Sequence, residues 1–279
     1  MTGTGGYLGS RVQAALRQRG WRVVEMTRQP RPGAEAIPFE LGVEIKPELL
    51  PGARALVHCA YDFSQPTWPD IHRVNVAGSE KLLRAARAAN VKTLIYISSI
   101  SAFDSCRALY GRAKLETERL AQSLGATIIR PGLVWGDAPG GPFGRLIDQV
   151  EQARVLPLFG GGRQIQFPVH DQDLAAAIGD FAEGKLSRPG VPITIAHEQP
   201  WTFHELLSEI ARAKGKNVSF VPVPWRLGWA VLKLAELCGL RLAFRSDNLV
   251  SLMNQNPNPS FAAQRELRII CRPFKLNRG

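Results

Sequence analysis

The chain lacks the patterns that mark disulfide-rich, zinc-binding and membrane-spanning proteins. Its 279 residues include only four cysteines, which are scattered and form no Cys-x-x-Cys pair or Cys/His cluster. This argues against a disulfide framework and a zinc site, and it is typical of a protein in a reducing cytoplasm. No apolar run of about 18 residues is free of charges, so we expect no transmembrane helix. The five histidines show no ligand spacing, so we expect no metal site.

Basic residues are in excess but are not gathered into a block. Lys and Arg number 35 against 24 Asp and Glu, which gives a formal net charge of +11. Such a surplus favours anionic partners such as nucleotides, nucleic acid or an acidic membrane surface. Because no run of five or six cations occurs, we expect no nucleic-acid binding. The N-terminus has neither the basic nor the apolar region of a signal peptide, and we expect a cytoplasmic location.

The first half of the chain alternates β-rich runs with helical patterns. Hydrophobic residues make up 45% of the chain and charged residues 21%, which is enough for a sizeable core. The alternation predicts an α/β fold with a doubly wound parallel sheet. Strands are expected over 22–26, 55–59, 93–98, 126–130 and 192–196. Helices are expected over 7–19, 74–89 and 109–124.

A glycine-rich loop opens the chain. Gly3, Gly6 and Gly9 have the spacing that permits a tight turn, a close approach of pyrophosphate to the backbone, and packing of the next helix on the sheet. Together with the helix and strand that follow, this spacing predicts a dinucleotide-binding site. The loop normally follows a strand, so the first strand is apparently missing. We expect roughly 6–8 apolar residues ahead of Met1.

The end of the strand expected over 22–26 bears on cofactor choice. An NAD-binding protein usually carries an acid there, about 20 residues after the glycines, for the ribose 2′-hydroxyl. Thr27 and Arg28 stand at that place, and an arginine suits a 2′-phosphate. We therefore favour NADP(H) over NAD(H). The alternative is a solvated Arg28 beside a turn at Pro30.

The pattern of the chain changes after Gly132. Helices are expected over 143–153, 201–213 and 225–244, the last interrupted at Gly239, and the tail after residue 253 has turn chemistry. We assign 1–132 and 166–197 to a Rossmann-like core, and 133–165 and 198–279 to a small substrate-binding cap and C-terminal tail. The spacing within 225–244 favours a cap helix that buries its apolar side. The alternative is a basic amphipathic helix on a membrane surface.

Hydroxyl and amino groups that suit proton transfer recur after the strand expected over 93–98. Tyr110 and Lys114 are four residues apart and therefore share one helix face. A neighbouring cation is expected to lower the pKa of the phenol towards working pH. Ser99, with Ser98 and Ser101 as alternatives, ends the strand with a hydroxyl for a substrate oxygen. Glu116 and Glu118, farther along the helix, are expected on a solvated face.

These motifs, in this order, resemble those of the extended short-chain dehydrogenase/reductase superfamily, and specifically of the NAD-dependent epimerase/dehydratase family. The matching stretches span about residues 1–200. They are Thr2–Gly9, His58-Cys59-Ala60, Asn75-Val76-Ala77-Gly78, Ser98-Ser99, Tyr110-Gly111-Arg112-Ala113-Lys114, Arg130-Pro131-Gly132 and 170–174.

The resemblance implies roles for individual residues. Tyr110 is similar to the catalytic acid/base, Lys114 to the lysine that binds the nicotinamide ribose, and Ser99 to the serine that orients the reacting oxygen. The implied cofactor contacts are Gly3, Gly6, Tyr7, Leu8, Gly9, Thr27, Arg28, Glu40, Leu41, His58, Cys59, Ala60, Asn75, Tyr110, Lys114 and Pro131.

One departure concerns the substrate. The arginine that grips the substrate diphosphate in sugar-nucleotide epimerases falls on Gln166 here. Arg145 or Arg163, together with Ser99, would then contact the substrate. His170 is interpreted as part of a structural turn.

The resemblance implies an epimerase, dehydratase or reductase that acts by reversible hydride transfer at a carbinol carbon. A nucleotide sugar is the leading substrate class, with carbonyl or steroid-like substrates as the alternative. A second class of function is a nucleotide-bound sensor or accessory protein without turnover. A homodimer is expected from the resemblance alone.

Overall fold

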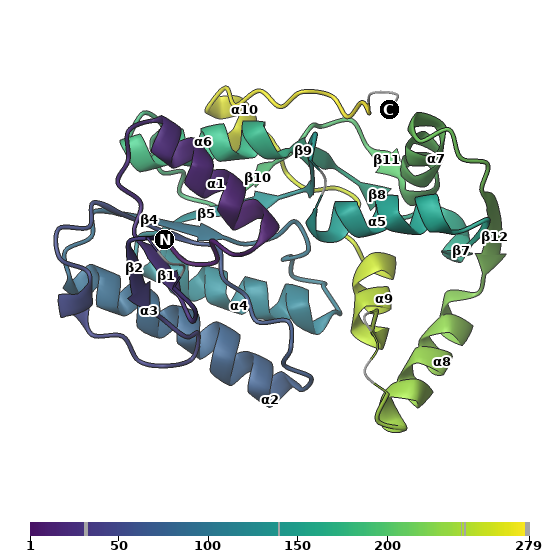
Figure 1. Cartoon of the computed structure of the whole chain (residues 1–279), viewed down its shortest axis with the longest axis horizontal. Coiled ribbons are helices and arrows are strands. Elements are labelled where there is room, and N and C mark those ends of the chain that lie inside the picture. The colour runs from purple at the N-terminus through teal and green to yellow at the C-terminus, as the bar shows by residue number, and fades with distance from the viewer. Residues whose placement is uncertain (31–32, 139, 241, 243, 277–279) are drawn as a thin grey trace.

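A computed structural model of the chain shows a parallel sheet with helices on both faces (Figure 1). The structure describes residues 1–30, 33–138, 140–240, 242 and 244–276. Four strands run in the order β10-β5-β4-β3, and β1 and β2 form a parallel pair beside them. Their bounds are β1 Glu25–Thr27, β2 Ala36–Pro38, β3 Ala55–His58, β4 Thr93–Ile97, β5 Thr127–Pro131 and β10 Ile193–Ile195. The predicted Rossmann-like α/β fold is confirmed.

Met1 and Thr2 lie between β1 and β3 and join the two groups of strands. Thr2 forms parallel bridges to both Met26 and His58. The Thr2 amide donates to the carbonyl of Val57 at 3.0 Å, and the carbonyl of Met1 accepts from the Met26 amide at 2.8 Å. These two residues therefore occupy the strand position that precedes the glycine loop. The longer strand expected ahead of Met1 stays a prediction.

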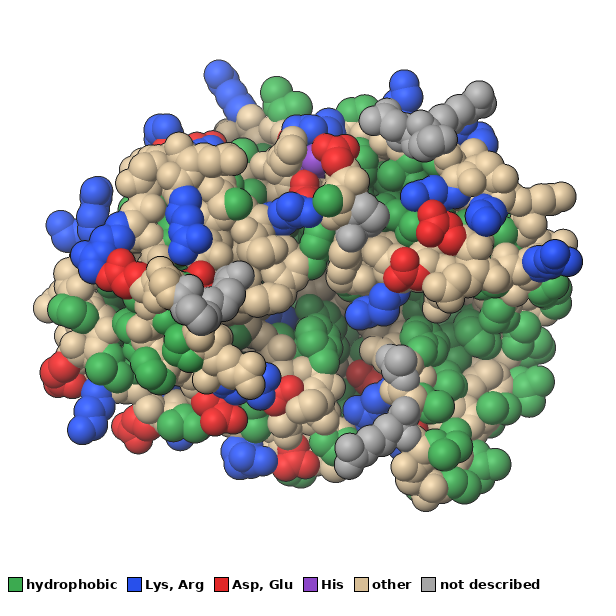
Figure 2. All heavy atoms as spheres, in the orientation of Figure 1, with side chains coloured by type: hydrophobic (Ala, Val, Ile, Leu, Met, Phe, Trp, Pro, Cys, Tyr) green, Lys and Arg blue, Asp and Glu red, His purple; other side chains and the backbone are tan. Residues whose placement is uncertain are grey.

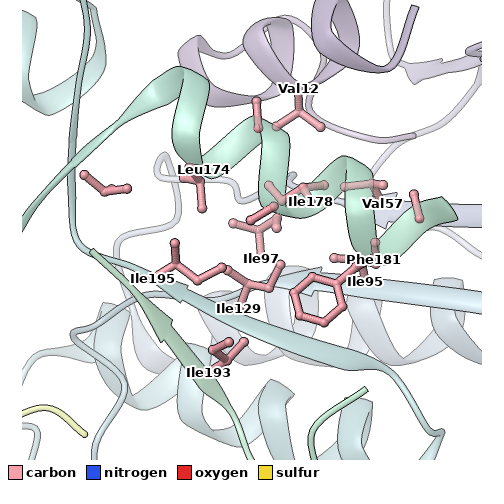
Figure 3. Close-up of a cluster of buried hydrophobic side chains, with 14 of the residues drawn as sticks. Val12, Val57, Ile95, Ile97, Ile129, Leu174, Ile178, Phe181, Ile193 and Ile195 are labelled. Carbon is pink, nitrogen blue, oxygen red and sulfur yellow. The ribbon is translucent and has the colours of Figure 1, made fainter. Parts of the chain in front are cut away.

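Helices cover the sheet in two layers (Figure 1). Helices α1 (Tyr7–Gln18) and α6 (Asp171–Glu183) lie on one face, and α3 (Ala77–Ala88) and α4 (Leu109–Ser123) lie on the other. Figure 3 shows how Val12, Leu174 and Ile178 of the first layer meet isoleucines from β4, β5 and β10. All three are fully buried, and each such side chain contributes about 1.5–3 kcal/mol to folding.

The segment before α3 is less regular than expected. A short helix α2 (Trp68–Ile71) leads into a π-helical turn at His72–Val76, and α3 begins only at Ala77. Single-turn helices also occur at Pro47–Leu49 and Gly160–Gly162. A π-helical turn often lies at a functional site because it displaces a side chain from the regular helical spacing. Here it carries Asn75.

A second lobe forms beside the carboxyl ends of the strands, with its own core. Helices α5 (Gly141–Gln152) and α7 (Phe203–Ala213) bury Phe143, Ile147, Leu206 and Ile210 together. The strands of the lobe are β6 Leu133–Trp135, β7 Val155–Phe159, β8 Ile165–Gln166, β9 Pro168–His170, β11 Trp201–Thr202 and β12 Ser219–Val223. Helix α7 begins with the predicted capping box, in which the Thr202 hydroxyl accepts from the Glu205 amide at 3.1 Å.

The helix expected over 225–244 is shorter than predicted and is packed differently. Helix α8 (Trp225–Leu237) ends before Gly239, whose φ of +79° suits the residue after a helix. The expectation that this helix buries its apolar side is wrong, because none of its residues is buried. It packs mainly against α9 (Ser246–Met253), away from the sheet (Figure 1). None of the described helices is long and apolar enough to cross a membrane.

The C-terminal segment returns to the sheet. It contains a short helix, α10 (Ala262–Glu266), where only turns are expected from the sequence. Phe261 and Cys271 join the core beside β10. The buried Gln264 side chain accepts from the Ala196 amide at 2.9 Å and donates to the Ala196 carbonyl at 3.0 Å. Part of the segment assigned to the cap and tail therefore packs on the core, and the division into domains stays a prediction.

Candidate active site

Tyr110 and Lys114 lie in the first turns of α4, close to the carboxyl end of β4. The Lys114 ammonium is buried and donates to the carbonyl of Ile97 at 2.8 Å. It lies 6.0 Å from the centre of the Tyr110 ring and 5.2 Å from that of Tyr61. The predicted tyrosine–lysine pair is thus held at one strand end, where ligands of open α/β sheets bind.

Ser99 is the serine that meets Tyr110. A hydrogen bond joins the side chains of Ser99 and Tyr110, and the Ser99 hydroxyl also accepts from the Ser101 amide at 3.1 Å. Ser98 is turned into the interior instead, where its hydroxyl donates to Glu118. The structure therefore brings together the three residues predicted to be catalytic, and Ser98 has a different partner.

Burial has the largest influence on the pKa values of Tyr110 and Lys114. It raises the pKa of Tyr110 to about 12, although the hydrogen bond with Ser99 works in the other direction. Burial also lowers the pKa of Lys114 to about 8, against the opposing influence of Cys59 and Glu118. The expectation of a lowered phenol pKa is therefore wrong, because desolvation of the phenolate is the largest influence on Tyr110. At neutral pH Tyr110 carries its proton.

Glu118 was missed as a site residue. It is 2% exposed and forms an ion pair with Arg130 of β5, with 2.8 Å between Oε1 and the guanidinium Nε. Its expected place on a solvated face is therefore wrong, whereas Glu116 is partly exposed and contacts His72. The burial of Glu118 could not be predicted from the sequence, because only the fold places its partner Arg130 opposite it. The pair holds Ser98 and so fixes the strand end on which Ser99 lies.

The glycine loop is shaped by contacts that tolerate no side chain. Gly3 has a φ of +74°, and a Cβ there would lie 2.8 Å from the amide nitrogen of Ala60. A Cβ on Gly9 would overlap the carbonyl oxygen of Gly3. No side chain caps the N-terminus of α1, where Gly6 is the N-cap, so amide groups of the first turn are available to a phosphate. Both features fit a bound dinucleotide.

Tyr7 and Leu8, in the first turn of α1, make different contacts. The Tyr7 hydroxyl donates to Asp171 at 2.9 Å, and its ring lies against Gly140, so it ties α1 to α6 and to the second lobe. Leu8 is partly buried and packs against the core. Asp171 also pairs with Arg11 at 3.2 Å. His170 caps α6 by accepting from the Gln172 amide at 3.2 Å, which confirms its structural interpretation.

The end of β1 carries the residues predicted to select the cofactor. A pocket lined by Thr27, Arg28 and Gln29 opens there. The Thr27 hydroxyl accepts from the Gln29 amide at 3.3 Å, and the Arg28 side chain is exposed. Against desolvation, which raises it, the pKa of Asp62 is lowered by hydrogen bonds from Ser64 and Gln65, with a smaller contribution from the charge of Arg28. Glu40 is exposed, and Leu41 packs into the core below α3.

The segment after β3 is fixed by buried polar groups. His58 is completely buried, with Nδ1 2.7 Å from the Thr2 hydroxyl and Nε2 2.9 Å from that of Ser79. Burial lowers its pKa to about 3, so the imidazole is neutral and structural. Burial raises the pKa of Cys59 to about 12, which leaves an unreactive thiol, and Ala60 donates its amide to Thr2 at 3.2 Å.

Asn75 holds the loop that follows. Its side chain accepts from the Asp62 amide at 2.7 Å and donates to the Asp62 carbonyl at 3.0 Å. This loop brings two aromatic rings to Tyr110 that sequence reasoning missed. Tyr61 lies edge-on at 4.9 Å between ring centres, and Phe63 is stacked at 5.5 Å. No motif marks these residues, because their role depends on the path of the loop.

The remaining predicted residues lie at the edge of the site or outside it. Pro131 is buried at the end of β5, and its carbonyl accepts from the Ile100 amide at 3.1 Å. Arg145 and Arg163 are exposed. Gln166 is buried and donates to Gln255 at 2.6 Å. Among the described residues no group of three or more His, Cys, Asp and Glu side chains is placed to hold a metal.

A further residue that the sequence did not reveal caps α4. Asp247, at the start of α9, accepts from the Leu109 amide at 2.9 Å and also from that of Tyr110. The N-cap residue of α4, Ala108, has no side chain that does this. The C-terminal helices are thereby joined to the helix turn that carries Tyr110.

The parallel sheet, the glycine loop and the uncapped N-terminus of α1 together define a dinucleotide-binding α/β protein. Residues 1–184 match the model of a family described as the NAD dependent epimerase/dehydratase family. The chain belongs to this family, and the resemblance seen in its motifs is confirmed.

Two of the curated relatives are named as reductases. A ceramide reductase of Caulobacter vibrioides is 25% identical over 234 residues, which cover 80% of this chain and 73% of that protein. A 2-alkyl-3-oxoalkanoate reductase of Stenotrophomonas maltophilia is 24% identical over 285 residues, covering 86% and 84%. Among solved structures, a UDP-glucuronic acid 4-epimerase of Bacillus cereus in complex with UDP-glucuronic acid and NAD is 20% identical. It has a TM-score of 0.67 and covers 80% of this chain and 85% of that one.

Proposed function

We propose that this protein is an NADP(H)-dependent reductase that converts a ketone on a largely apolar substrate into a secondary alcohol. The observation that carries the proposal is the meeting of Ser99, Tyr110 and Lys114 at one strand end. The bound cofactor would supply the hydride that forms the new C–H bond. The residues of this chain would supply the proton and hold the reacting oxygen.

Tyr110 is the proton donor in this proposal. Burial keeps its pKa near 12, so the phenol is protonated at neutral pH and is ready to give a proton to the carbonyl oxygen as that oxygen gains charge. Ser99 lies within hydrogen-bonding reach of the same hydroxyl and would hold the substrate oxygen beside it. A protonated acid at rest supports reduction rather than oxidation as the favoured direction.

Lys114 would bind the ribose next to the nicotinamide. Its ammonium has three N–H donors, and the only hydrogen bond seen for it in the described structure goes to the Ile97 carbonyl. A buried cation without a carboxylate partner is costly, and ribose hydroxyls would satisfy the remaining donors. The exposed Arg28, at the edge of the pocket after β1, supports binding of a 2′-phosphate and therefore NADP(H).

Three observations support an apolar substrate. The rings of Tyr61 and Phe63 lie against Tyr110, so the surroundings of the reacting hydroxyl are aromatic. Gln166 occupies the place of the arginine expected to grip a substrate diphosphate, and its amide is already engaged by Gln255. The two curated relatives described above are named as reductases of a ceramide and of a 2-alkyl-3-oxoalkanoate, which also favours a ketone on a long apolar chain.

A nucleotide-sugar epimerase is the second candidate. It is supported by the family match and by the likeness of the fold to a UDP-glucuronic acid 4-epimerase. Arg145 and Arg163, both exposed, are the cations that would take over the role of the missing arginine. An epimerase of this kind would retain its oxidised cofactor between turnovers, whereas a reductase would exchange it.

The first experiment is to denature the purified protein and identify any released dinucleotide by mass spectrometry. The proposal expects little retained cofactor, reversible binding of NADPH, and NADPH oxidation with 2-alkyl-3-oxo acids but not with UDP-sugars. Retained NAD with turnover of UDP-sugars would instead support the epimerase. Binding of NADPH without turnover of either substrate class would support the non-catalytic alternative.

Substitution of the proposed proton donor tests the mechanism. Tyr110→Phe should lower kcat by about 10²–10⁴-fold and leave the Kd for NADPH nearly unchanged, because only the transferred proton is lost. Ser99→Ala should also lower kcat, by a smaller factor. Ser101→Ala is the matched control, since Ser101 contacts Ser99 through its backbone amide, which the substitution leaves in place. Unchanged turnover by the Tyr110 variant would disprove the assignment.

A further inference from the structure

Helix α8 presents a stripe of apolar side chains to solvent. We define this α8 stripe as Leu227, Val231, Leu234 and Leu237, which are 60%, 61%, 63% and 75% exposed. Their spacing of three or four residues places them on one side of the helix. Figure 2 shows hydrophobic side chains gathered over the lobe that contains α8. A contiguous exposed patch of this kind marks an interaction surface more often than scattered single residues do.

The other side of α8 is attached to the protein. Gly228 lies against the ring of Phe159 at the end of β7, so no larger residue fits there. Glu236 accepts hydrogen bonds from the backbone amide and the hydroxyl of Ser246, at 2.7 Å and 2.9 Å, and so fixes α8 to the start of α9. The orientation of the α8 stripe is therefore set by specific contacts on the opposite side.

Cations flank the α8 stripe along one edge. Arg226 and Lys233 are seven residues apart, which places them almost in line along the helix. Both are exposed, and the guanidinium of Arg226 lies 5.9 Å from the centre of the Trp225 ring. Glu236 is the single acid of α8; it accepts from Ser246 and also lies 3.7 Å from the Lys233 ammonium and 3.8 Å from the Arg245 guanidinium. An apolar stripe with a cationic edge and flanking tryptophan is the composition of a helix that lies in a membrane interface.

We propose that α8 docks this protein on an anionic lipid surface, with the α8 stripe in the interface and Arg226 and Lys233 among the headgroups. Charge complementarity favours this occupant, because each cation near an anionic membrane adds to the binding. A second copy of the chain is disfavoured, since each copy has a net charge of +11 and would bring a cationic edge to the contact. The proposal is independent of the proposed reductase function.

The docked helix would be connected to the candidate active site through α9. Helix α8 is fixed to α9 through Glu236 and Ser246, and α9 caps α4 through Asp247 beside Tyr110.

Vesicle sedimentation tests the proposal with the full chain. We expect wild-type protein to pellet with vesicles of phosphatidylcholine and phosphatidylglycerol, and to bind vesicles of phosphatidylcholine alone at least about tenfold more weakly. Raising the salt concentration should release it in part. Failure to pellet with the anionic vesicles would overturn the proposal.

Two sets of variants identify the binding surface. Leu227→Ser/Val231→Ser/Leu234→Ser should lower the partition coefficient at least about tenfold, and Arg226→Gln/Lys233→Gln should lower it on the order of tenfold. The matched controls remove the same number of exposed groups elsewhere and should stay within about twofold. They are Val43→Ser/Val191→Ser/Ile270→Ser and Lys92→Gln/Arg188→Gln.

Folding and self-association are followed in the same proteins. All variants should retain the Tm of the wild type, because the substituted side chains face solvent. Equal pelleting of the stripe variant and the wild type would contradict the proposal. A wild-type dimer in sedimentation velocity that dissociates in the stripe variant, without vesicle binding, would identify a second copy as the occupant.

Discussion

Two regions of the molecule use apolar residues in opposite ways. One is the nucleotide-binding half, which is the parallel sheet with the helices on its two faces, and the other is the pair of helices α8 and α9, which we call the α8–α9 arm. In the first, isoleucines of β4, β5 and β10 are buried beneath α1 and α6 (Figure 3), and even the polar His58 and Glu118 are enclosed with partners. In α8, by contrast, no residue is buried, and five large apolar side chains, those of the α8 stripe and Trp229, face water. The apolar side chains of the first region are covered by other parts of the described structure, whereas those of α8 are left facing solvent.

The difference has a consequence for tolerance to substitution. In the glycine loop, single added carbon atoms would collide with backbone, as at Gly3 and Gly9. On α8 even three leucine-sized side chains can be shortened without leaving a cavity, because their outer surfaces already contact solvent. The nucleotide-binding half should therefore fail by losing its fold, and the α8–α9 arm by losing an interaction.

The largest expected effect is in the glycine loop. Gly9→Ala should destabilise the protein by about 3 kcal/mol and weaken dinucleotide binding, because its Cβ would overlap the Gly3 carbonyl. Thermal unfolding should show a Tm lower by roughly 5–10 °C. Gly5→Ala is the matched control, since its Cβ would have no neighbour within 4 Å, and it should change stability by less than about 0.5 kcal/mol. Equal Tm values for the two variants would refute the packing argument.

The next effect concerns the choice of cofactor. Arg28→Gln should weaken NADPH binding by about 10–100-fold and leave NADH binding nearly unchanged, because a charge-assisted hydrogen bond to the 2′-phosphate is removed. Titration followed by fluorescence would measure both affinities. Lys46→Gln removes an exposed cation ahead of the single-turn helix at Pro47–Leu49 and should affect neither cofactor. Equal losses for NADH and NADPH would mean that Arg28 does not read the phosphate.

A smaller effect is expected from pH. The pKa of Lys114 is about 8, so binding that needs the charged ammonium should be constant below pH 8. Above that value it should weaken, by at most about tenfold per pH unit, as Lys114 loses its proton. Measuring the Kd for NADPH from pH 6.5 to 9.5 should show a bend in the plot of log Kd against pH, and Lys114→Met should remove that bend. A bend that persists in the variant would have to come from another group.

The smallest effect lies at the junction of the two regions. Asp247→Ala should cost about 1 kcal/mol, because the amides of Leu109 and Tyr110 lose their acceptor. As a positioning residue, Asp247 should affect kcat by a few-fold and leave the Kd for NADPH unchanged, and Asp247→Asn should restore most of the rate. A loss of NADPH affinity that accompanies the loss of rate would indicate a general structural role.

Some of this arrangement was predictable from the sequence because its signals are local. The glycine spacing, the position of Tyr110 four residues before Lys114, and the capping box at Thr202 each depend on residues close in the chain. Their positions in the fold follow from the order of strands and helices in a parallel sheet. The predicted strand at 22–26 begins later, at Glu25, because the residues before it pack without forming a ladder.

Other features depend on contacts between distant segments. Glu118 has the sequence context of a solvated acid and becomes buried because Arg130 of β5 faces it. The pKa of Tyr110 follows from the enclosure of its ring by Tyr61 and Phe63, which a neighbouring lysine does not reveal. Helix α8 is apolar on more than one side, so periodicity alone could not show which side faces the protein.

The hydrogen bonds of Gln264 bear on the tendency of the folded protein to aggregate. Strand β10 is the outermost strand of the four-stranded sheet, and such an edge is a template on which strands of other molecules add and aggregate. The Gln264 amide imitates a neighbouring strand by saturating both backbone groups of Ala196, directly after β10. The Gln264 side chain thus occupies the backbone groups that an added strand would use at the end of β10, and this disfavours edge-to-edge association.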